Sequence, residues 1–102
     1  MKRGEVWVVD LGLAAKVRPC LLLTDYPGQQ EERMLITVLP HTTAVRGSPW
    51  EIALDKPFLK RGAFDTQQIQ SLSTSAFVRR IGALTPSEMA QVADRLRHRL
   101  SL

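Results

Sequence analysis

The sequence predicts a mainly β domain that ends in a single C-terminal α-helix. Short β-branched and aromatic runs alternate with Gly and Pro turn signals, and a capping box followed by an apolar helical stripe lies near the C-terminus. The chain has 102 residues, room for one domain over residues 1–102, and an apolar share of 44% is ordinary for a globular protein. We therefore expect a small antiparallel barrel or sandwich with one helix.

The first three strands are predicted at residues 5–10, 18–24 and 34–39. The first run, Glu-Val-Trp-Val-Val-Asp, is rich in β-branched and aromatic residues. Pro19 indicates that the second strand begins there or forms an edge, because proline cannot donate to the ladder. Gly12 opens a short connection through Ala14 and Ala15, and Pro27-Gly28 signals a turn before the third strand.

The second half of the chain alternates between loops and shorter strands. Residues 42–49 contain Gly-Ser-Pro and are predicted to be largely loop, and residues 55–62 contain a proline and a glycine and are predicted as a second loop. Between them, residues 50–54 alternate in polarity and predict a half-exposed strand. Two further strands are predicted over residues 63–71 and 77–83.

The C-terminal segment gives the clearest prediction. Thr85 and Glu88 have the spacing of a capping box, and Pro86 stands at the first helical position. An apolar stripe then follows at helical spacing, and cations gather in the last turns, where they suit the helix dipole. The stripe is Met89, Val92, Leu96 and Leu100, and the basic residues are Arg95, Arg97, His98 and Arg99.

Charge and cysteine content narrow the functional class. A net charge of +4 favours nucleic acid, an anionic membrane surface or an acidic protein as partner, with simple solubility as the alternative. The single cysteine, Cys20, lies in an apolar run and is predicted to be a buried hydrophobe. Glu5 and Asp10 interrupt any signal-peptide core, and no stretch reaches transmembrane length, so we expect a soluble, cytoplasmic protein.

Motifs for cofactors are missing from the sequence. His41 and His98 stand far apart without a third ligand, so no metal site and no cofactor are expected. Any chemistry then falls to guanidinium, hydroxyl, amide and carboxylate groups at strand ends and loops, which suit phosphates and base edges. These candidates are Lys16, Arg18, Thr42, Thr43, Arg46, Asp65, Gln67, Gln68 and Gln70.

Each candidate also has a purely structural interpretation. Arg18 could form an exposed salt bridge, and the hydroxyls of Thr42 and Thr43 could close the strand in an ST-turn. Asp65 is favoured as a solvated surface charge. His41 neighbours Thr42 on a strand, so its imidazole is expected to point to the opposite side.

Four stretches resemble the MazF/PemK toxin family. Residues 2–11 are similar to its opening strand, and the Arg-Pro-Cys-Leu-Leu-Leu run from Arg18 is similar to its second strand. Residues 40–52, Pro-His-Thr-Thr-Ala-Val-Arg-Gly-Ser-Pro-Trp-Glu-Ile, resemble the family's Pro-x-Thr-[Ser/Thr]-x-x-[Lys/Arg]-Gly-x-Pro-[aromatic]-Glu motif without a gap. Residues 68–72 resemble its Gln-[Ile/Val]-x-[Ser/Thr] strand, so the resemblance spans nearly the whole chain.

The resemblance implies an SH3-like small antiparallel barrel of the CcdB/MazF type. It also implies a homodimer and the toxin of a type II toxin–antitoxin system, held in check by an acidic antitoxin. The implied activity is that of an mRNA interferase, a sequence-specific, metal-independent endoribonuclease. It would cut single-stranded RNA through the 2′-hydroxyl, leaving a 2′,3′-cyclic phosphate and a 5′-hydroxyl. The family's catalytic arginine and threonine match Arg18 and Thr42, and the other candidates become RNA-binding residues.

The chain departs from the family pattern at three places. Its first loop is short, with only residues 12–17 joining two strands. Gln67 stands where an acidic residue is common, and Asp65, two residues earlier on the same predicted strand face, is a possible substitute. Gln70 replaces a common Arg or Lys. Two alternatives stay open: a non-catalytic gyrase poison of the CcdB kind, and a toxin-derived nucleic-acid-binding module without activity.

Overall fold

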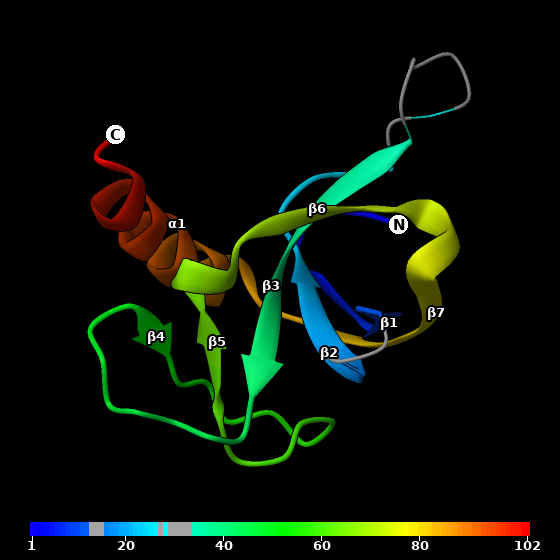
Figure 1. The fold of residues 1–102 in the computed structure, drawn as a ribbon. Coiled ribbons are helices and arrows are strands. Elements are labelled where there is room, and N and C mark those ends of the chain that lie inside the picture. Colours follow the sequence, from blue (N-terminus) through cyan, green and yellow to red (C-terminus); the bar gives the residue numbers. More distant parts are fainter. Residues whose placement is uncertain (13–15, 27, 29–33) are drawn as a thin grey trace.

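The computed structural model describes residues 1–12, 16–26, 28 and 34–102. The predicted connection through Ala14 and Ala15 lies outside these residues, as does Pro27 of the predicted Pro-Gly turn. Within the described part, seven antiparallel strands and two short 3-10 helices precede one C-terminal α-helix (Figure 1). The predicted mainly β class with a terminal helix is therefore confirmed.

The sheet runs in the order β4-β5-β3-β2-β1-β7, and β6 pairs with β3 beside β5. The first three strands are β1 (Glu5–Asp10), β2 (Val17–Leu22) and β3 (Leu35–Thr42). The later strands are β4 (Glu51–Ile52), β5 (Ala63–Asp65), β6 (Gln70–Ser73) and β7 (Phe77–Ala83). In the described pairings the end strands β4 and β7 do not meet, so the expected barrel is a curved, open sheet.

The predicted strand over residues 63–71 is wrong as one continuous element. The 3-10 helix η1 (Thr66–Gln68) separates β5 from β6. Thr66 is fully buried and donates both its amide and its hydroxyl to the Trp50 carbonyl, at 3.0 and 2.7 Å. Strand β5 pairs with the second half of β3, and β6 pairs with its first half. The η1 turn joins these two strands.

Strand β2 spans Val17–Leu22, where residues 18–24 were predicted, and two further strands also differ from the prediction. The strand expected over residues 50–54 contains only Glu51 and Ile52, because its partner β5 is itself short and offers two pairing positions. Strand β3 continues through Thr42, three residues beyond the predicted end, because His41 and Thr42 pair with Phe64 and Ala63. Both differences arise from pairing between distant segments.

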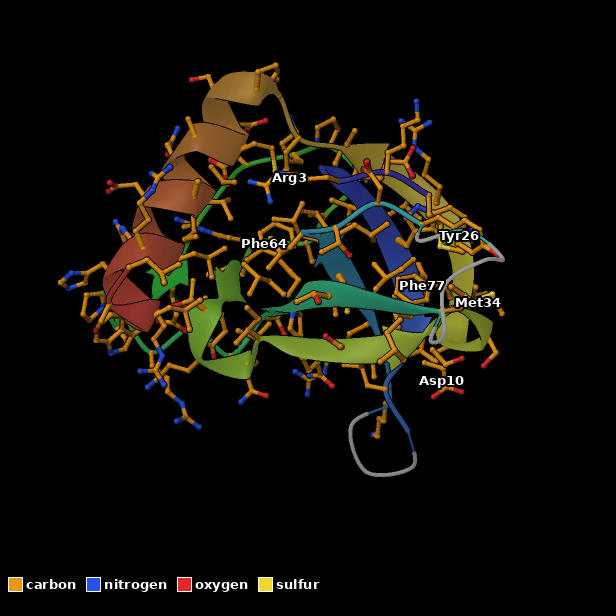
Figure 2. All side chains as sticks on the ribbon, turned by 90° about the horizontal axis from the view of Figure 1, so that it is seen from above. Arg3, Asp10, Tyr26, Met34, Phe64 and Phe77 are labelled. Atoms are coloured by element: carbon orange, nitrogen blue, oxygen red, sulfur yellow. The ribbon has the colours of Figure 1, made fainter. Side chains whose placement is uncertain are left out.

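Two apolar clusters occupy the two faces of the sheet. The cluster beneath the helix contains Val6, Leu21, Leu39, Phe64 and Val92, all fully buried. Figure 2 shows the Phe64 side chain between the helix and the strands, with Phe77 on the far side of the sheet from the helix. The second cluster lies on the other face and is formed by Val9, Cys20, Leu22, Ile36 and Val38, against which Phe77 packs. Burial raises the pKa of Cys20 to about 12, as expected for a structural hydrophobe.

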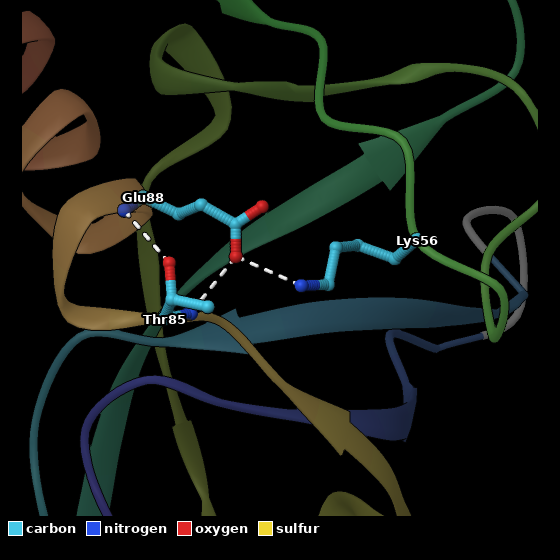
Figure 3. A network of polar contacts seen from close by, with 3 residues as sticks. All are labelled: Lys56, Thr85 and Glu88. Carbon is cyan, nitrogen blue, oxygen red and sulfur yellow. Dashed lines mark hydrogen bonds and ion pairs between the residues drawn. The ribbon is translucent and has the colours of Figure 1, made fainter.

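The helix α1 (Pro86–Leu100) begins at the predicted capping box. Thr85 Oγ1 accepts from the Glu88 amide at 3.2 Å, and Glu88 Oε1 accepts from the Thr85 amide at 2.8 Å (Figure 3). Lys56 Nζ donates to the same carboxylate oxygen at 2.8 Å and, with the Thr85 amide, holds the pKa of Glu88 below its usual value. Helix capping thereby also anchors the loop before β5.

The body of the helix is held by both its apolar stripe and its basic residues. Val92 is fully buried, and Met89 and Leu96 pack against the first cluster, whereas Leu100 is 45% exposed and departs from the predicted stripe. Arg95 donates to the carbonyls of Pro49 and Glu51, at 2.7 and 3.1 Å. The His98 ring stacks on Trp50 with centroids 5.2 Å apart. The last turns therefore fix the segment that leads into β4.

Replacing Thr85 with alanine is expected to lower the free energy of unfolding by about 1 kcal/mol, because the Glu88 amide loses its acceptor. The measurement is urea denaturation at neutral pH. Ser87→Ala is the matched control, since Ser87 is exposed in the same turn and is not the cap. Equal losses in the two variants would contradict the capping role.

Candidate functional site

The strand register brings Arg18 and Thr42 together at one end of the sheet. Strands β2 and β3 pair through Leu22–Val38, Leu21–Leu39 and Cys20–Pro40. Arg18 lies two residues before Cys20 and Thr42 two residues after Pro40, just beyond this paired stretch, and both line the same two surface hollows. Pro19 lies where β2 pairs with β1 but no longer with β3, which agrees with its predicted place near a strand start.

Two surface hollows meet at this pair of residues, and Arg18, Thr42 and Ala44 line both of them. The first, here the amide hollow, has a volume of about 330 Å³. The second, here the cationic hollow, has a volume of about 480 Å³. The amide hollow is further lined by Leu11, Pro40, Arg46, Glu51, Asp65, Gln67, Gln68 and Gln70, and the cationic hollow by Val8, Val17, Pro19, His41, Thr43, Phe58, Lys60, Arg79 and Ile81.

The structure brings eight of the nine predicted site residues to these hollows. Seven of them line the amide hollow, and Thr43 lines the cationic hollow. Lys16 lines neither, because it closes the neck of the first loop: its amide donates to the Gly12 carbonyl at 2.8 Å and its carbonyl accepts from the Leu11 amide at 2.9 Å. Its backbone is in the left-handed region, with φ of 61°.

Thr42 makes the ST-turn that was the structural alternative for this residue. Its Oγ1 accepts from the Ala44 amide at 3.1 Å. The bond uses an oxygen lone pair and leaves the hydroxyl proton available for donation. The turn therefore orients a donor toward the space beside Arg18 and does not exclude a role in binding or chemistry.

Asp65 is partly exposed, and it is not a strand neighbour of Gln67. Its Oδ1 accepts from the Gln67 amide at 2.9 Å and caps η1. Gln67 lies within this 3-10 helix, so the predicted common strand face for the two residues is wrong. The cap instead fixes the turn that carries Gln67 and Gln68 to the amide hollow.

Glu51 lines the amide hollow and stabilises the loop before β4. Its carboxylate accepts from the amides of Arg46 and Ser48, at 3.1 and 2.9 Å. These backbone donors hold the pKa of Glu51 below its usual range, so the group stays an anion at neutral pH. The arrangement shapes the loop that presents Arg46 and makes Glu51 a poor proton acceptor.

His41 lies on the other face of β3 from Thr42, as expected from strand alternation. Its side chain is 4% exposed and packs edge-on against Phe64, with centroids 5.1 Å apart. Nε2 is buried and makes no hydrogen bond within the described residues. Burial lowers the pKa of His41 below 6.5, so the imidazole is neutral at pH 7.

A pH dependence of stability follows from this buried imidazole. In the unfolded chain His41 takes up a proton below about pH 6.5, whereas the folded protein resists protonation until lower pH. We therefore expect the free energy of unfolding to fall as the pH drops from 7.5 to 5. In denaturation series over this range, His41→Gln should show a flatter profile than the wild type. Parallel profiles would contradict this prediction.

Sequence reasoning missed three residues of the cationic hollow: Phe58, Lys60 and Arg79. For Arg79 a signal existed, because adjacent arginines on a predicted strand must point to opposite faces. Phe58 and Lys60 lie in the loop between β4 and β5, where no periodicity indicates direction. Among the described residues, no group of three His, Cys, Asp or Glu side chains is placed to hold a metal ion. In the same residues, no helix has the length and apolarity needed to cross a bilayer.

Comparisons with known proteins connect this geometry to a family. Residues 2–100 match the family described as PemK-like, MazF-like toxin of type II toxin–antitoxin system. The chain is 29% identical over 97 residues to the probable endoribonuclease MazF5 of Mycobacterium tuberculosis, covering 92% of this chain and 87% of that protein. It is also 29% identical over 115 residues to endoribonuclease MazF9 of the same organism, covering 100% and 98%.

Solved structures share the fold. A mycobacterial endoribonuclease in complex with its cognate antitoxin superposes with a TM-score of 0.82 at 22% identity, covering 100% of this chain and 96% of that one. The Mycobacterium tuberculosis toxin MazF-mt6 superposes with a TM-score of 0.79 at 26% identity, covering 96% and 97%. The open, mainly β sheet with its terminal helix is thus the arrangement of these proteins.

Proposed function

From the premise that the chain belongs to the PemK-like, MazF-like toxin family, we propose that it is an endoribonuclease toxin that cuts single-stranded RNA at Arg18 and Thr42. The observation that carries this proposal is that Arg18 and Thr42 both line the two surface hollows, at the place where these hollows meet. The family relatives MazF5 and MazF9 bear the name endoribonuclease, which supports the same activity here.

RNA cleavage of this kind does not require a nucleophile from the protein, because the 2′-hydroxyl of the RNA is the nucleophile. The 2′-hydroxyl oxygen attacks the adjacent phosphorus and gives its proton to water, and the bond from phosphorus to the 5′-oxygen breaks as that oxygen takes a proton from water. The products are a 2′,3′-cyclic phosphate and a 5′-hydroxyl. Arg18 clamps two non-bridging oxygens through its planar fork, and Thr42 donates its free hydroxyl proton to the same phosphate.

The amide hollow binds the nucleotides beside the cut. Gln67, Gln68 and Gln70 offer both donors and acceptors to base edges, and Arg46 supplies a cation for the backbone. Asp65 contributes by holding η1 in place. Thr43 and Lys16 complete the proposed RNA-binding set, with Lys16 acting from the neck of the first loop. The cleavage motif then depends on which bases these amides match.

The partners follow from the family. We propose that the chain folds as one domain over residues 1–102, acts as a homodimer in the cytoplasm, and is inhibited by an acidic antitoxin. Two copies side by side would extend the open edges of the sheet into a continuous groove, and a net charge of +4 suits an acidic inhibitor. Sedimentation of the purified protein tests the dimer, and the neighbouring reading frame should encode the antitoxin.

The test of the activity is incubation of the purified protein with a long single-stranded RNA in EDTA. Primer extension should reveal discrete cuts, and the new 5′ ends should accept label from polynucleotide kinase without prior phosphatase treatment. Intact RNA would overturn the catalytic proposal. RNA-binding and gyrase-inhibition assays would then separate the two non-catalytic alternatives.

A further inference from the structure

The cationic hollow lies outside the base-reading site proposed above, although it shares Arg18 and Thr42 with it. Lys60 and Arg79 add two further cations, and both side chains are exposed. None of the described residues that line this hollow is acidic. A concave surface to which Lys60 and Arg79 bring two cations, and whose described lining holds no carboxylate, suits a polyanion.

The register of β7 explains why Arg79 faces this hollow and its neighbour does not. Val8 pairs with both Pro19 and Arg79, so these three side chains share a face of the sheet. Arg80 is one residue further along and points to the other face, where its Nε lies 3.5 Å from Glu5 Oε2. Arg79 and Arg80 therefore form a matched pair for experiment: the same charge on the same strand, with only one lining the hollow.

The loop that carries Lys60 is fixed at several points. Lys56 is ion-paired to Glu88 of the helix cap, and the Leu59 amide donates to the Lys56 carbonyl at 3.0 Å. The Phe58 ring lies directly on Gly82 of β7: a Cβ atom at Gly82 would lie 2.3 Å from the ring. The contact between Phe58 and Gly82 thus holds the loop against the sheet, so that Lys60 lines the same hollow as Arg79.

An RNA strand cut at Arg18 and Thr42 must continue on both sides of the cut. Because these two residues line both hollows, an RNA strand that continues on both sides of the scissile phosphate would have one hollow on each side of the cut. The amide hollow holds three glutamines that can read base edges, whereas the cationic hollow offers cations and the apolar surfaces of Val8, Phe58 and Ile81. The two sides of the substrate therefore meet different chemistry.

We propose that the cationic hollow binds the RNA backbone on one side of the cut through Lys60 and Arg79, and that it does so without reading sequence. This inference rests on the proposed ribonuclease function. Phosphate contacts give affinity that depends on salt, and an apolar or aromatic surface accepts any base. The hollow then sets how tightly RNA is held, while the amide hollow sets which sequence is cut.

The experiment measures binding of a short RNA that contains the mapped cut motif. A 2′-deoxy nucleotide at the reacting position prevents cleavage, and the dissociation constant is measured at several salt concentrations. Lys60→Ala and Arg79→Ala should each reduce the slope of log affinity against log salt by about 0.7, which is about fivefold in affinity near 0.1 M salt. Arg80→Ala and Arg61→Ala are the matched controls and should leave the slope unchanged, because Arg80 neighbours Arg79, exposed Arg61 neighbours Lys60, and neither lines the cationic hollow. The cut motif should be the same in all variants.

Trimming the RNA gives a second, independent measurement. Shortening it from the end that enters the cationic hollow should weaken binding to the wild type but not to the Lys60→Ala/Arg79→Ala double variant. Shortening from the other end should affect both proteins alike. If the double variant responds to trimming as the wild type does, or if Arg80→Ala changes the slope as much as Arg79→Ala, the inference is overturned while cleavage by the wild type still upholds the ribonuclease. If the wild type neither binds nor cuts RNA, both fail.

Discussion

Arg18→Ala is expected to slow RNA cleavage by about a hundredfold to a thousandfold, the usual consequence of losing one well-placed donor to a developing oxyanion. The side chain is exposed, so the melting temperature should change little. The measurement is the single-turnover rate with enzyme in excess, which separates chemistry from product release. Arg80→Ala removes the same charge away from the junction of the hollows and is the control.

Arg18→Lys distinguishes a geometric role from a purely electrostatic one. Lysine keeps the charge but lacks the planar fork that grips two phosphate oxygens at once. We therefore expect it to recover only part of the rate lost in the alanine variant. Full recovery would show that charge alone suffices and would contradict the bidentate clamp.

The same assay tests Thr42 through its hydroxyl. Thr42→Ser retains the Oγ that accepts from the Ala44 amide and that we propose to donate to phosphate, so most of the rate should remain. Thr42→Ala removes both bonds and should lose roughly a hundredfold. If serine and alanine were equally inactive, the methyl group and the strand conformation would matter more than the hydroxyl.

Gly62→Ala is expected to have the second largest effect, because it inserts an atom where the backbone of Thr42 already lies. A Cβ atom at Gly62 would be 2.1 Å from the Thr42 carbonyl oxygen and 2.7 Å from His41 Cε1. A backbone carbonyl between paired strands cannot move aside cheaply, so Thr42 or β5 must shift. We expect a loss of about 2–3 kcal/mol in the free energy of unfolding.

This displacement should also lower activity, measured at a temperature where the variant remains folded. A shift of about 1 Å in a catalytic group can cost about a hundredfold in rate. Gly47→Ala is the control: Gly47 has φ of +72° and open space around it, so alanine there adds backbone strain of about 1–2 kcal/mol without a clash. Normal stability and activity in Gly62→Ala would contradict the predicted clash.

Local signals in the sequence determined the parts of the fold that depend on near neighbours. The helix start at Thr85 and the strands at residues 5–10 and 77–83 lie where they were predicted, because capping, alternation and β-branching act within a few residues. The burial of Cys20 followed from its apolar run in the same way. Arg18 and Thr42 were identified from motifs, and their catalytic role stays a prediction.

Only the tertiary structure decided how distant segments meet. The pairing of β2 with β3 brings Arg18 and Thr42 to the same two hollows. The pairing of β3 with both β5 and β6 requires η1 to interrupt the predicted long strand. The cationic hollow depends on Phe58 packing on Gly82, a contact between segments 24 residues apart by their numbers. A one-residue change of register would turn each of these side chains to the other face, and hydrophobic pattern alone does not specify which strand pairs with which. The sequence therefore determined which groups are available for chemistry, while burial and pairing across the whole chain decided which of them share a site.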